Sequence, residues 1–353
     1  MASAQTNDLN ERFARAMALQ RSGQFTEAEA EYRQIIAQAP NYAEAQANLG
    51  AVLAQLGRLK EAVTSYETAL ALNPALKPIW LNLGIAHYRA AQFAQAATAL
   101  ENFLAVAPTH LQARQLLGTA LVEVGRDADA IPHLEAALQA APEELTCLYS
   151  LGLAYLHQSK PALAGLIERL QKQPAGQALA QLLQGQFLLS QTKYKEANAA
   201  FLAAAKSNEQ LPRLQYWLGL SYYMLDEKKA ALACLQKEMQ QTPDDVATLL
   251  QLAQLEMELL YFDQAKQHTE AALRSEPSNV RAQKLLGTTL YKQGQANAAL
   301  PVWEALAKQT PDDAEAHYYL GQIYKRLGRA KEAAEHGERS EQLRAAQKAG
   351  VKP

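Results

Sequence analysis

The fold is decided by residues 43–76, which read AEAQANLGAVLAQLGRLKEAVTSYETALALNPAL. In the first part of this stretch, Leu49 and Leu53 stand four residues apart and therefore lie on one face of a helix. Gly57 interrupts this helical pattern, and a second one follows it as far as Pro74. Proline ends a helix because it has no amide hydrogen and disfavours α geometry in the residue before it. The stretch predicts two short helices joined by a tight turn.

The same pattern recurs about every 34 residues along the chain. An alanine fills the twentieth position of every unit, and this column comprises Ala28, Ala62, Ala96, Ala130, Ala164, Ala197, Ala231, Ala265, Ala299 and Ala333. A glycine column at the eighth position runs in phase with it and comprises Gly50, Gly84, Gly118, Gly152, Gly185, Gly219, Gly287 and Gly321. Small side chains at these positions predict that two helix backbones approach closely, because a bulky residue there would cost about 1–3 kcal/mol in overpacking.

Ten units in this register account for nearly all of the 353 residues. Their bounds are 9–42, 43–76, 77–110, 111–144, 145–177, 178–211, 212–245, 246–279, 280–313 and 314–347. We group them into units one to five (9–177) and units six to ten (178–347). Residues 1–8 then form an N-terminal extension and residues 348–353 a tail. Each unit is too small to fold alone, so the units are expected to bury one continuous core by stacking.

Several columns of the unit identify a known family. The third unit carries Trp80, Leu83-Gly84, Ala96, Phe103 and Pro108, and the second carries the equivalent glycine, alanine and proline. This pattern resembles the tetratricopeptide repeat, a helix–turn–helix unit of 34 residues. The resemblance implies an all-α fold, a right-handed α-α superhelical solenoid. It also implies that the first helix of each unit lines a concave groove, and that the second helix of the last unit serves as the C-terminal cap.

The pattern breaks at the ends and in the fifth unit. Arg12 and Arg15 replace apolar residues in the first unit, as expected of an end unit that has no preceding neighbour. In the fifth unit the apolar stripe lies one residue out of phase and consists of Leu163, Leu166, Ile167 and Leu170. One interpretation is a locally adapted packing interface. The other is a change in the path of the array between its two halves, with hinge motion as a further possibility.

The sequence contains no motif typical of an enzyme. Its 34 basic and 36 acidic side chains give a net charge of −2, which argues against a dedicated nucleic-acid binder. The histidines and the two cysteines show no metal-ligand spacing, and phosphate-binding or nucleophile motifs are absent. We therefore expect no catalytic residue, no metal and no cofactor. His87 is expected to be a packed, hydrogen-bonded core residue. The acidic residues that follow repeat prolines are predicted to cap helices, and they are Glu143-Glu144, Asp244-Asp245 and Asp312-Asp313.

Family positions that face the groove give the candidate binding residues. In the first half these are Asn48, Asn82, Tyr88 and Arg89. Asn48 and Asn82 occupy equivalent positions, and they are similar to the asparagine ladder of O-linked N-acetylglucosamine transferases, which implies contact with a peptide backbone. The other interpretation is that Asn-Leu-Gly is simply common in such repeats.

The candidate groove residues of the second half are aromatic and basic. They are Arg213, Tyr216, Trp217, Tyr223, Arg281, Lys284, Tyr291, Lys292, Tyr318, Tyr319, Lys325 and Arg326. Aromatic and arginine side chains dominate binding hot spots, although about half of these aromatics are expected to be core between adjacent helices. We predict that this half binds an acidic or carboxylate-bearing peptide. The residues that clamp a chaperone's C-terminal carboxylate in related co-chaperones are missing in both registers, so a chaperone-tail adaptor is not expected.

The leading functional hypothesis is a non-enzymatic scaffold that binds peptide segments or partner proteins. The alternatives are a regulatory or substrate-recruiting subunit of a separate enzyme such as a glycosyltransferase, and an assembly factor for a secretion, pilus or envelope system. RNA binding is not expected because the chain lacks a basic excess. No apolar stretch approaches about 18 residues, so no membrane span is expected. The expected compartment is the cytoplasm, or the periplasm if a signal peptide preceded the small residues Ala2-Ser3-Ala4.

Overall fold

The computed structural model describes residues 2–348, with side chains from residue 8 onward. The described chain is all-α. Its first ten helices are α1 (Ala2–Arg21), α2 (Phe25–Gln38), α3 (Ala43–Gln55), α4 (Leu59–Leu72), α5 (Ile79–Arg89), α6 (Phe93–Leu104), α7 (Leu111–Glu123), α8 (Asp127–Ala140), α9 (Leu145–His157) and α10 (Leu163–Gln171). After a short 3-10 turn, η1 (Pro174–Gly176), follow α11 (Gln177–Ser190), α12 (Tyr194–Ser207), α13 (Leu214–Met224), α14 (Lys228–Gln241), α15 (Val246–Glu258), α16 (Phe262–Ser275), α17 (Val280–Lys292), α18 (Ala296–Gln309), α19 (Ala314–Arg326) and α20 (Ala330–Lys348).

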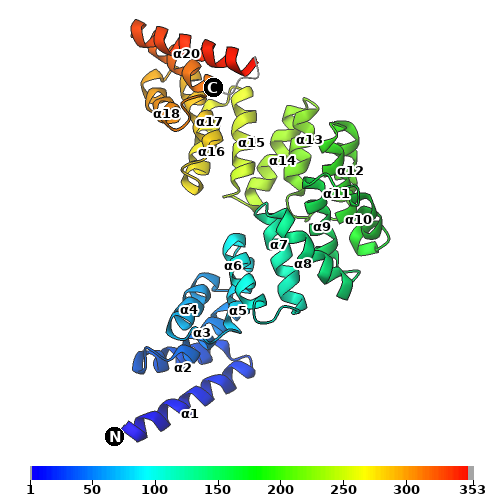
Figure 1. Ribbon diagram of the computed structural model, residues 1–353, viewed down its shortest axis with the longest axis vertical. Coiled ribbons are helices and arrows are strands. Elements are labelled where there is room, and N and C mark those ends of the chain that lie inside the picture. The colour runs from blue at the N-terminus through cyan, green and yellow to red at the C-terminus, as the bar shows by residue number, and fades with distance from the viewer. Residues whose placement is uncertain (1, 349–353) are drawn as a thin grey trace. The chain divides into compact units, whose positions relative to one another are not determined.

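These helices form the repeated pairs that the sequence predicts (Figure 1). Within a pair such as α3 and α4, the two helices pack against each other, and the second helix packs on the first helix of the next pair. First helices of consecutive units also contact each other, for example α15 with α17 and α17 with α19. The chain divides into two compact units, Met1–Leu183 and Gln184–Pro353, with the boundary inside α11.

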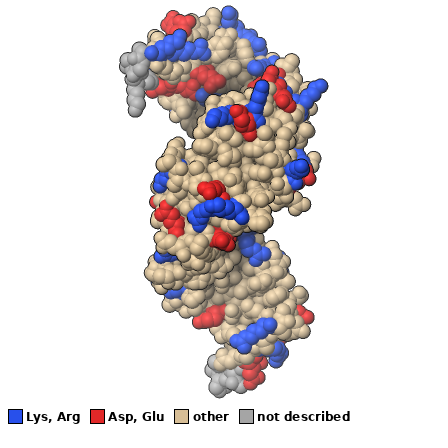
Figure 2. Space-filling model, turned by 90° about the vertical axis from the view of Figure 1, so that its right-hand side faces the viewer, with Lys and Arg blue, Asp and Glu red and all other residues tan. Residues whose placement is uncertain are grey.

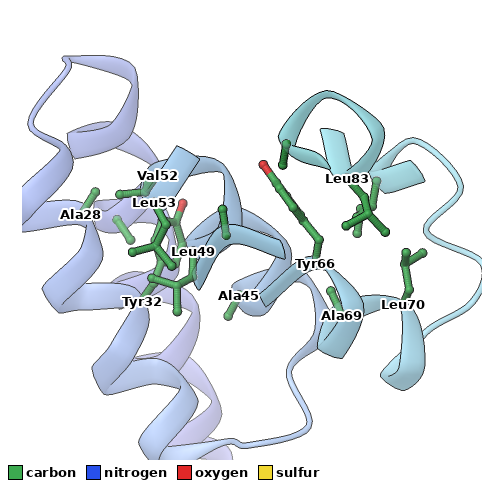
Figure 3. Close-up of a cluster of buried hydrophobic side chains, with 14 of the residues drawn as sticks. Ala28, Tyr32, Ala45, Leu49, Val52, Leu53, Tyr66, Ala69, Leu70 and Leu83 are labelled. Atoms are coloured by element: carbon green, nitrogen blue, oxygen red, sulfur yellow. The ribbon is translucent and has the colours of Figure 1, made fainter. Parts of the chain in front are cut away.

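The core of the first compact unit illustrates the packing (Figure 3). Tyr32 of α2 and Leu53 of α3 are fully or almost fully buried, and Ala28 lies beside them with no exposed surface. Tyr66 of α4 and Leu83 of α5 continue the cluster into the next pair. The core is therefore shared between successive units rather than closed within each one.

Six of the eight glycines in the eighth-position column, all except Gly152 and Gly321, lie under a large side chain sixteen residues further along. A Cβ atom on Gly50 would lie 2.8 Å from the ring of Tyr66, and one on Gly118 would lie 2.6 Å from Cγ of Leu134. The same geometry recurs in the second compact unit, where Gly219 lies under Leu235. Glycine lets the two helices of a pair approach closely, as the sequence predicts.

The turn between the two helices of a unit, hereafter the helix turn, always holds one residue with positive φ. In five described units that residue is a glycine: Gly23, Gly57, Gly125, Gly294 and Gly328. In the other five it is Ala91, Ser159, Thr192, Asp226 or Leu260. The left-handed conformation is costly for any residue with a Cβ atom, so these five turns carry backbone strain that glycine would avoid.

The fifth unit is irregular, as its shifted apolar stripe predicts. Its second helix, α10, has only nine residues, and Leu163, Leu166, Ile167 and Leu170 are its buried side chains. Ala164, which the alanine column placed at a helix–helix contact, is exposed. That expectation was wrong because the stripe shifts by one residue and brings Leu163 into the contact instead. The space beside Gly152 of α9 is filled by Leu183 of α11, since a Cβ atom on Gly152 would lie 2.3 Å from Cδ2 of Leu183.

The two ends of the array differ from the inner units. Helix α1 begins at Ala2, so residues 2–8 of the N-terminal extension are helical and continuous with the first helix of the first unit. Arg12 and Arg15 both pair with Glu31 of α2. In α20 the buried residues are Ser340 and Leu343, and the rest of the helix is exposed or half-exposed as expected of a cap. The predicted tail beyond Lys348 lies outside the described residues. Among the described helices, none is long and apolar enough to cross a membrane.

Candidate functional site

The candidate residues of the first half lie on α3 and α5. Asn48 is half-buried and Asn82 is exposed. The ring of Tyr88 packs edge-on against Phe93 with centroids 5.5 Å apart, and burial raises its pKa above the ordinary value for tyrosine. Arg89 donates to the carbonyl oxygen of Ala54 at 3.3 Å, near the carboxyl end of α3. Arg89 therefore links α5 to the preceding unit, whereas the Tyr88 ring packs on the second helix of its own unit. Asn82 is the more accessible of the two asparagines.

In the second compact unit, Arg213 begins a cluster at the amino end of α13. Its φ is +59°, and its guanidinium lies 4.7 Å from the centre of the Tyr216 ring and 3.6 Å from a carboxylate oxygen of Asp245. Tyr216 meets Trp217 edge-on at 5.2 Å, and Trp217 stacks on Phe201 of α12 at 6.4 Å. Part of this aromatic group is thus inter-helix packing, as the sequence predicts for about half of the aromatics.

Arg213 cannot cap α13 with an acceptor side chain, and a glutamate of the following helix supplies that function. Glu238 of α14 is 2% exposed and accepts from the backbone nitrogen of Tyr216 at 3.3 Å. Burial raises the pKa of Glu238, while the hydrogen bond from Tyr216 acts in the opposite direction. Sequence reasoning missed this residue because nothing in its local pattern links it to the start of the preceding helix.

Tyr223 lies near the carboxyl end of α13, and Arg281 lies in the first turn of α17. The Tyr223 hydroxyl donates to a Glu258 carboxylate oxygen at 2.5 Å, and burial together with this contact raises its pKa to about 12. Glu258 also pairs with Lys228 at 3.1 Å. Arg281 donates to the amide oxygen of Gln251 at 3.3 Å. It is exposed, and within the described residues no carboxylate forms an ion pair with it.

The positive charge of Lys284, in contrast, is compensated by two carboxylates of the same chain. Its ammonium group lies 2.5 Å from Asp313 and 2.9 Å from Glu315, and its side chain is 27% exposed. Burial alone would lower its pKa, but the hydrogen bonds to Asp313 and Glu315 outweigh it and raise the pKa. Asp313 lies just outside the groove positions considered in the sequence, which is why its pairing with Lys284 was not foreseen.

An aromatic and arginine cluster joins α17 to α19. Tyr291 meets Tyr319 edge-on at 5.7 Å, and Tyr319 stacks on Trp303 of α18 at 4.6 Å. The guanidinium of Arg326 lies 4.0 Å from the centre of the Tyr291 ring and donates to the Tyr291 carbonyl oxygen at 2.8 Å. Stacking of this kind holds the arginine in one orientation without neutralising its charge.

The remaining candidates lie around this cluster. Tyr318 is 40% exposed, with the guanidinium of Arg344 4.9 Å from its ring centre. Lys292 and Lys325, in the last turns of α17 and α19, are exposed, and among the described residues neither belongs to an ion pair with a carboxylate. We call Arg281, Lys292, Lys325 and Arg326, together with Tyr291, Tyr318 and Tyr319, the basic aromatic face.

Charge elsewhere on the surface is mixed. In Figure 2, which shows one face of the molecule, basic and acidic side chains are interspersed, and most of the surface is neither. Many of these charges pair locally, for example Arg58 with Glu29 and Glu61. At these sites, neighbouring opposite charges compensate each other locally.

In each acidic pair predicted to cap a helix, the second residue has that role. Glu144, Asp245 and Asp313 accept from backbone nitrogens at the starts of α9, α15 and α19. His87 is 6% exposed, and its Nδ1 lies 2.8 Å from the side-chain oxygen of Gln92. Over the described part of the chain, no three or more His, Cys, Asp or Glu side chains gather as metal ligands would.

One histidine pair was not foreseen. The Nδ1 atoms of His317 on α19 and His336 on α20 lie 2.8 Å apart. The two rings are stacked with centroids 5.0 Å apart, and Tyr324 stacks on His336 at 5.4 Å. The residues are nineteen positions apart and on different helices, so spacing along a single helix gives no sign of their contact.

Comparison with known proteins identifies the repeat. The family model described as tetratricopeptide repeat matches residues 13–76, 81–144, 116–178, 182–246, 250–296 and 285–349. Among solved structures, a tetratricopeptide repeat protein from Parabacteroides merdae ATCC 43184 is 15% identical, with a TM-score of 0.44 over 80% of this chain and 99% of that one. MamA from Desulfovibrio magneticus RS-1 is 24% identical, with a TM-score of 0.42 over 46% of this chain and 92% of that one. No curated protein matches the chain. The family model covers most of the sequence, and the chain belongs to the tetratricopeptide repeat family.

Proposed function

We propose that this protein is a non-enzymatic scaffold that binds an acidic peptide segment on the basic aromatic face. Members of the family commonly serve as protein-interaction scaffolds. The observation that carries the proposal is a set of exposed cations that have no carboxylate partner in the described part of the chain. They are Arg281, Lys292 and Lys325, on the same first helices as Tyr291 and Tyr319. Unpaired cations beside fixed aromatic rings suit a ligand that has carboxylates and apolar anchors.

The structure changes which residues should matter for binding. Lys284 has its charge compensated by Asp313 and Glu315, so its contribution to a peptide's carboxylates is expected to be small. Arg326 is held against Tyr291 and can present its remaining N–H groups to a ligand. Burial raises the pKa of the Tyr216 and Tyr223 hydroxyl groups, and the positive charge of Arg281 acts in the opposite direction on both.

The test uses the full chain and an array of fluorescein-labelled peptides in which acidic residues alternate with Leu, Phe or Tyr. Binding is measured by fluorescence anisotropy at low and at physiological salt. We expect acidic peptides to bind, the affinity to fall with salt, and the variant R281Q/K292Q/K325Q to lose at least about tenfold in affinity.

A matched control removes the same number of charges from second helices. Lys195 and Lys206 of α12 and Lys308 of α18 are all exposed, so K195Q/K206Q/K308Q changes the net charge equally. This control should bind as the wild type does. Equal loss in both variants would show that only overall charge matters, and no acidic binder in the array would refute the proposed face.

A further inference from the structure

The basic aromatic face is interrupted by an acidic group where α19 begins. Lys284 of α17 pairs there with Asp313 at 2.5 Å and with Glu315 at 2.9 Å. One ammonium group and two carboxylates leave a local net charge of −1. We call these three residues the Lys284 group. The four cations of the basic aromatic face, in contrast, have no carboxylate partner within the described chain.

The Lys284 group lies between two positive regions of the face. Arg281 is in the first turn of α17, and Lys292 is in its last turn. They are about three helical turns apart, so they lie on one side of the helix about 16 Å from each other along its axis. An extended peptide covers that length with about five residues. A peptide that follows α17 from Arg281 to Lys292 therefore passes the Lys284 group.

The two carboxylates of the group differ in how firmly they are held. Asp313 is the N-cap of α19, where it accepts from the Glu315 nitrogen at 2.9 Å, and its side chain is 17% exposed. The side chain of Glu315 is 48% exposed and pairs with Lys284 from the first turn of α19. Asp313 is thus part of the helix framework, and Glu315 is the carboxylate that a ligand on this face would meet.

The charge of Glu315 also acts on an aromatic side chain of the face. Burial raises the pKa of the Tyr319 hydroxyl, the hydrogen bond with Thr288 acts in the opposite direction, and the negative charge of Glu315 raises the pKa further. Tyr319 in turn meets Tyr291 edge-on at 5.7 Å. Glu315 therefore borders the aromatic part of the face as well as Lys284.

We propose that Glu315 sets the charge pattern of the bound peptide by excluding a carboxylate from the segment that lies over Lys284. This inference rests on the proposed function of the face. A peptide carboxylate at that point would meet a net negative charge instead of a free cation, and such repulsion is a common source of specificity. The preferred ligand has acidic residues at the two ends of a segment of about five residues and uncharged residues between them.

The test compares two fluorescein-labelled peptides of about nine residues with the full chain by fluorescence anisotropy. Both peptides have glutamates at their two ends and one Leu and one Tyr in the middle. The remaining middle positions are serines in the first peptide and glutamates in the second. E315Q should strengthen binding of the second peptide by about threefold or more and change that of the first by less than about twofold.

Two further variants isolate the effect. Glu209 is another exposed glutamate that pairs with a lysine, Lys237 of α14, outside the basic aromatic face. E209Q changes the net charge as E315Q does and should leave both affinities within about twofold of the wild type. K284Q/E315Q also removes the cation that E315Q frees, so the second peptide should bind it as weakly as it binds the wild type. Circular dichroism should show that E315Q stays folded, because Asp313 still caps α19.

Failure of this inference can be told from failure of the proposed function. Suppose that the first peptide binds and that R281Q/K292Q/K325Q weakens it. If E315Q then strengthens both peptides alike, or neither, the face binds peptides but Glu315 does not select among them. If neither peptide binds the wild type or E315Q, the proposed function fails and this inference fails with it.

Discussion

Gly185 of α11 lies directly beneath the ring of Phe201 of α12. A Cβ atom at Gly185 would come within 2.4 Å of Cε1 of Phe201, which is fully buried. We expect G185A to lower the free energy of unfolding by about 1 kcal/mol or more. Overpacking costs about 1–3 kcal/mol, whereas replacing a helical glycine by alanine gains only about 0.5–1 kcal/mol. Urea denaturation followed by circular dichroism measures the change.

Gly165 of α10 provides the matching control. A Cβ atom there would meet nothing within 4 Å. G165A should therefore raise the free energy of unfolding by about 0.5–1 kcal/mol, because only the helix preference acts. If both variants shifted stability in the same direction, the close approach at Gly185 would not be what selects glycine.

Thr192 is the one β-branched residue among the five non-glycine residues with positive φ in the described helix turns. Its φ is +58°, and a β-branched residue pays heavily for that conformation. T192G should stabilise the protein by about 1 kcal/mol, and the reverse change G57A, at φ +78°, should destabilise it by a similar amount. The midpoint of thermal unfolding reports both, and no gain in T192G would mean that the strain is relieved in another way.

The contact between His317 and His336 should make the C-terminal helix pair sensitive to acid. Nε2 of His317 lies 3.0 Å from the Pro311 carbonyl oxygen and must donate to it, so the neutral Nδ1 of His317 accepts from His336. Burial, reinforced by His317, lowers the pKa of His336, while Glu335 and Glu304 act in the opposite direction.

A lowered histidine pKa means that the unfolded chain binds the proton more readily than the folded one. The stability is therefore fully present above the unfolded value of about pH 6.5, and it is lost as the pH falls from there through the lower pKa of His336 in the folded state. Thermal unfolding at about pH 7.5 and about pH 5.5 should show a smaller difference for H336Q than for the wild type. An equal difference in the two proteins would contradict this.

Lys284 and Lys292 lie on the same helix but should behave differently when changed to glutamine. K284Q leaves Asp313 and Glu315 without their shared cation and should lower the free energy of unfolding by about 1 kcal/mol. K292Q should change it by less than about 0.5 kcal/mol, because Lys292 is exposed. Chemical denaturation separates the two, and equal effects would show that the ion pairs add nothing.

The fold could be predicted from the sequence because each unit repeats the same packing requirement. Small residues recur where a large side chain of the partner helix must fit, and the eight alanines of the column that lie outside units five and ten are buried. Ala164 shows the limit of this reasoning. Its position in the column is correct, yet α10 turns a different face inward, and only the shifted stripe of leucines indicates this.

The candidate site could be predicted in outline but not in its electrostatics. Helical spacing places Tyr291, Tyr319 and Arg326 on neighbouring first helices, and the structure brings them together. Helical spacing could not reveal that Asp313 forms an ion pair with Lys284, because this contact depends on how the start of α19 packs against the side of α17. Whether these residues bind a partner remains a prediction.

The packing of Leu183 over Gly152 limits how this array can be divided. In the other glycine-containing units up to the ninth, a residue of the same unit covers the glycine, so exchange of whole units would preserve that contact. The fifth unit instead borrows its covering side chain from α11. A fragment that ends at residue 177 would lack Leu183 and expose the bare backbone at Gly152. Modular reshuffling of this protein, by engineering or by recombination, should therefore keep units five and six together.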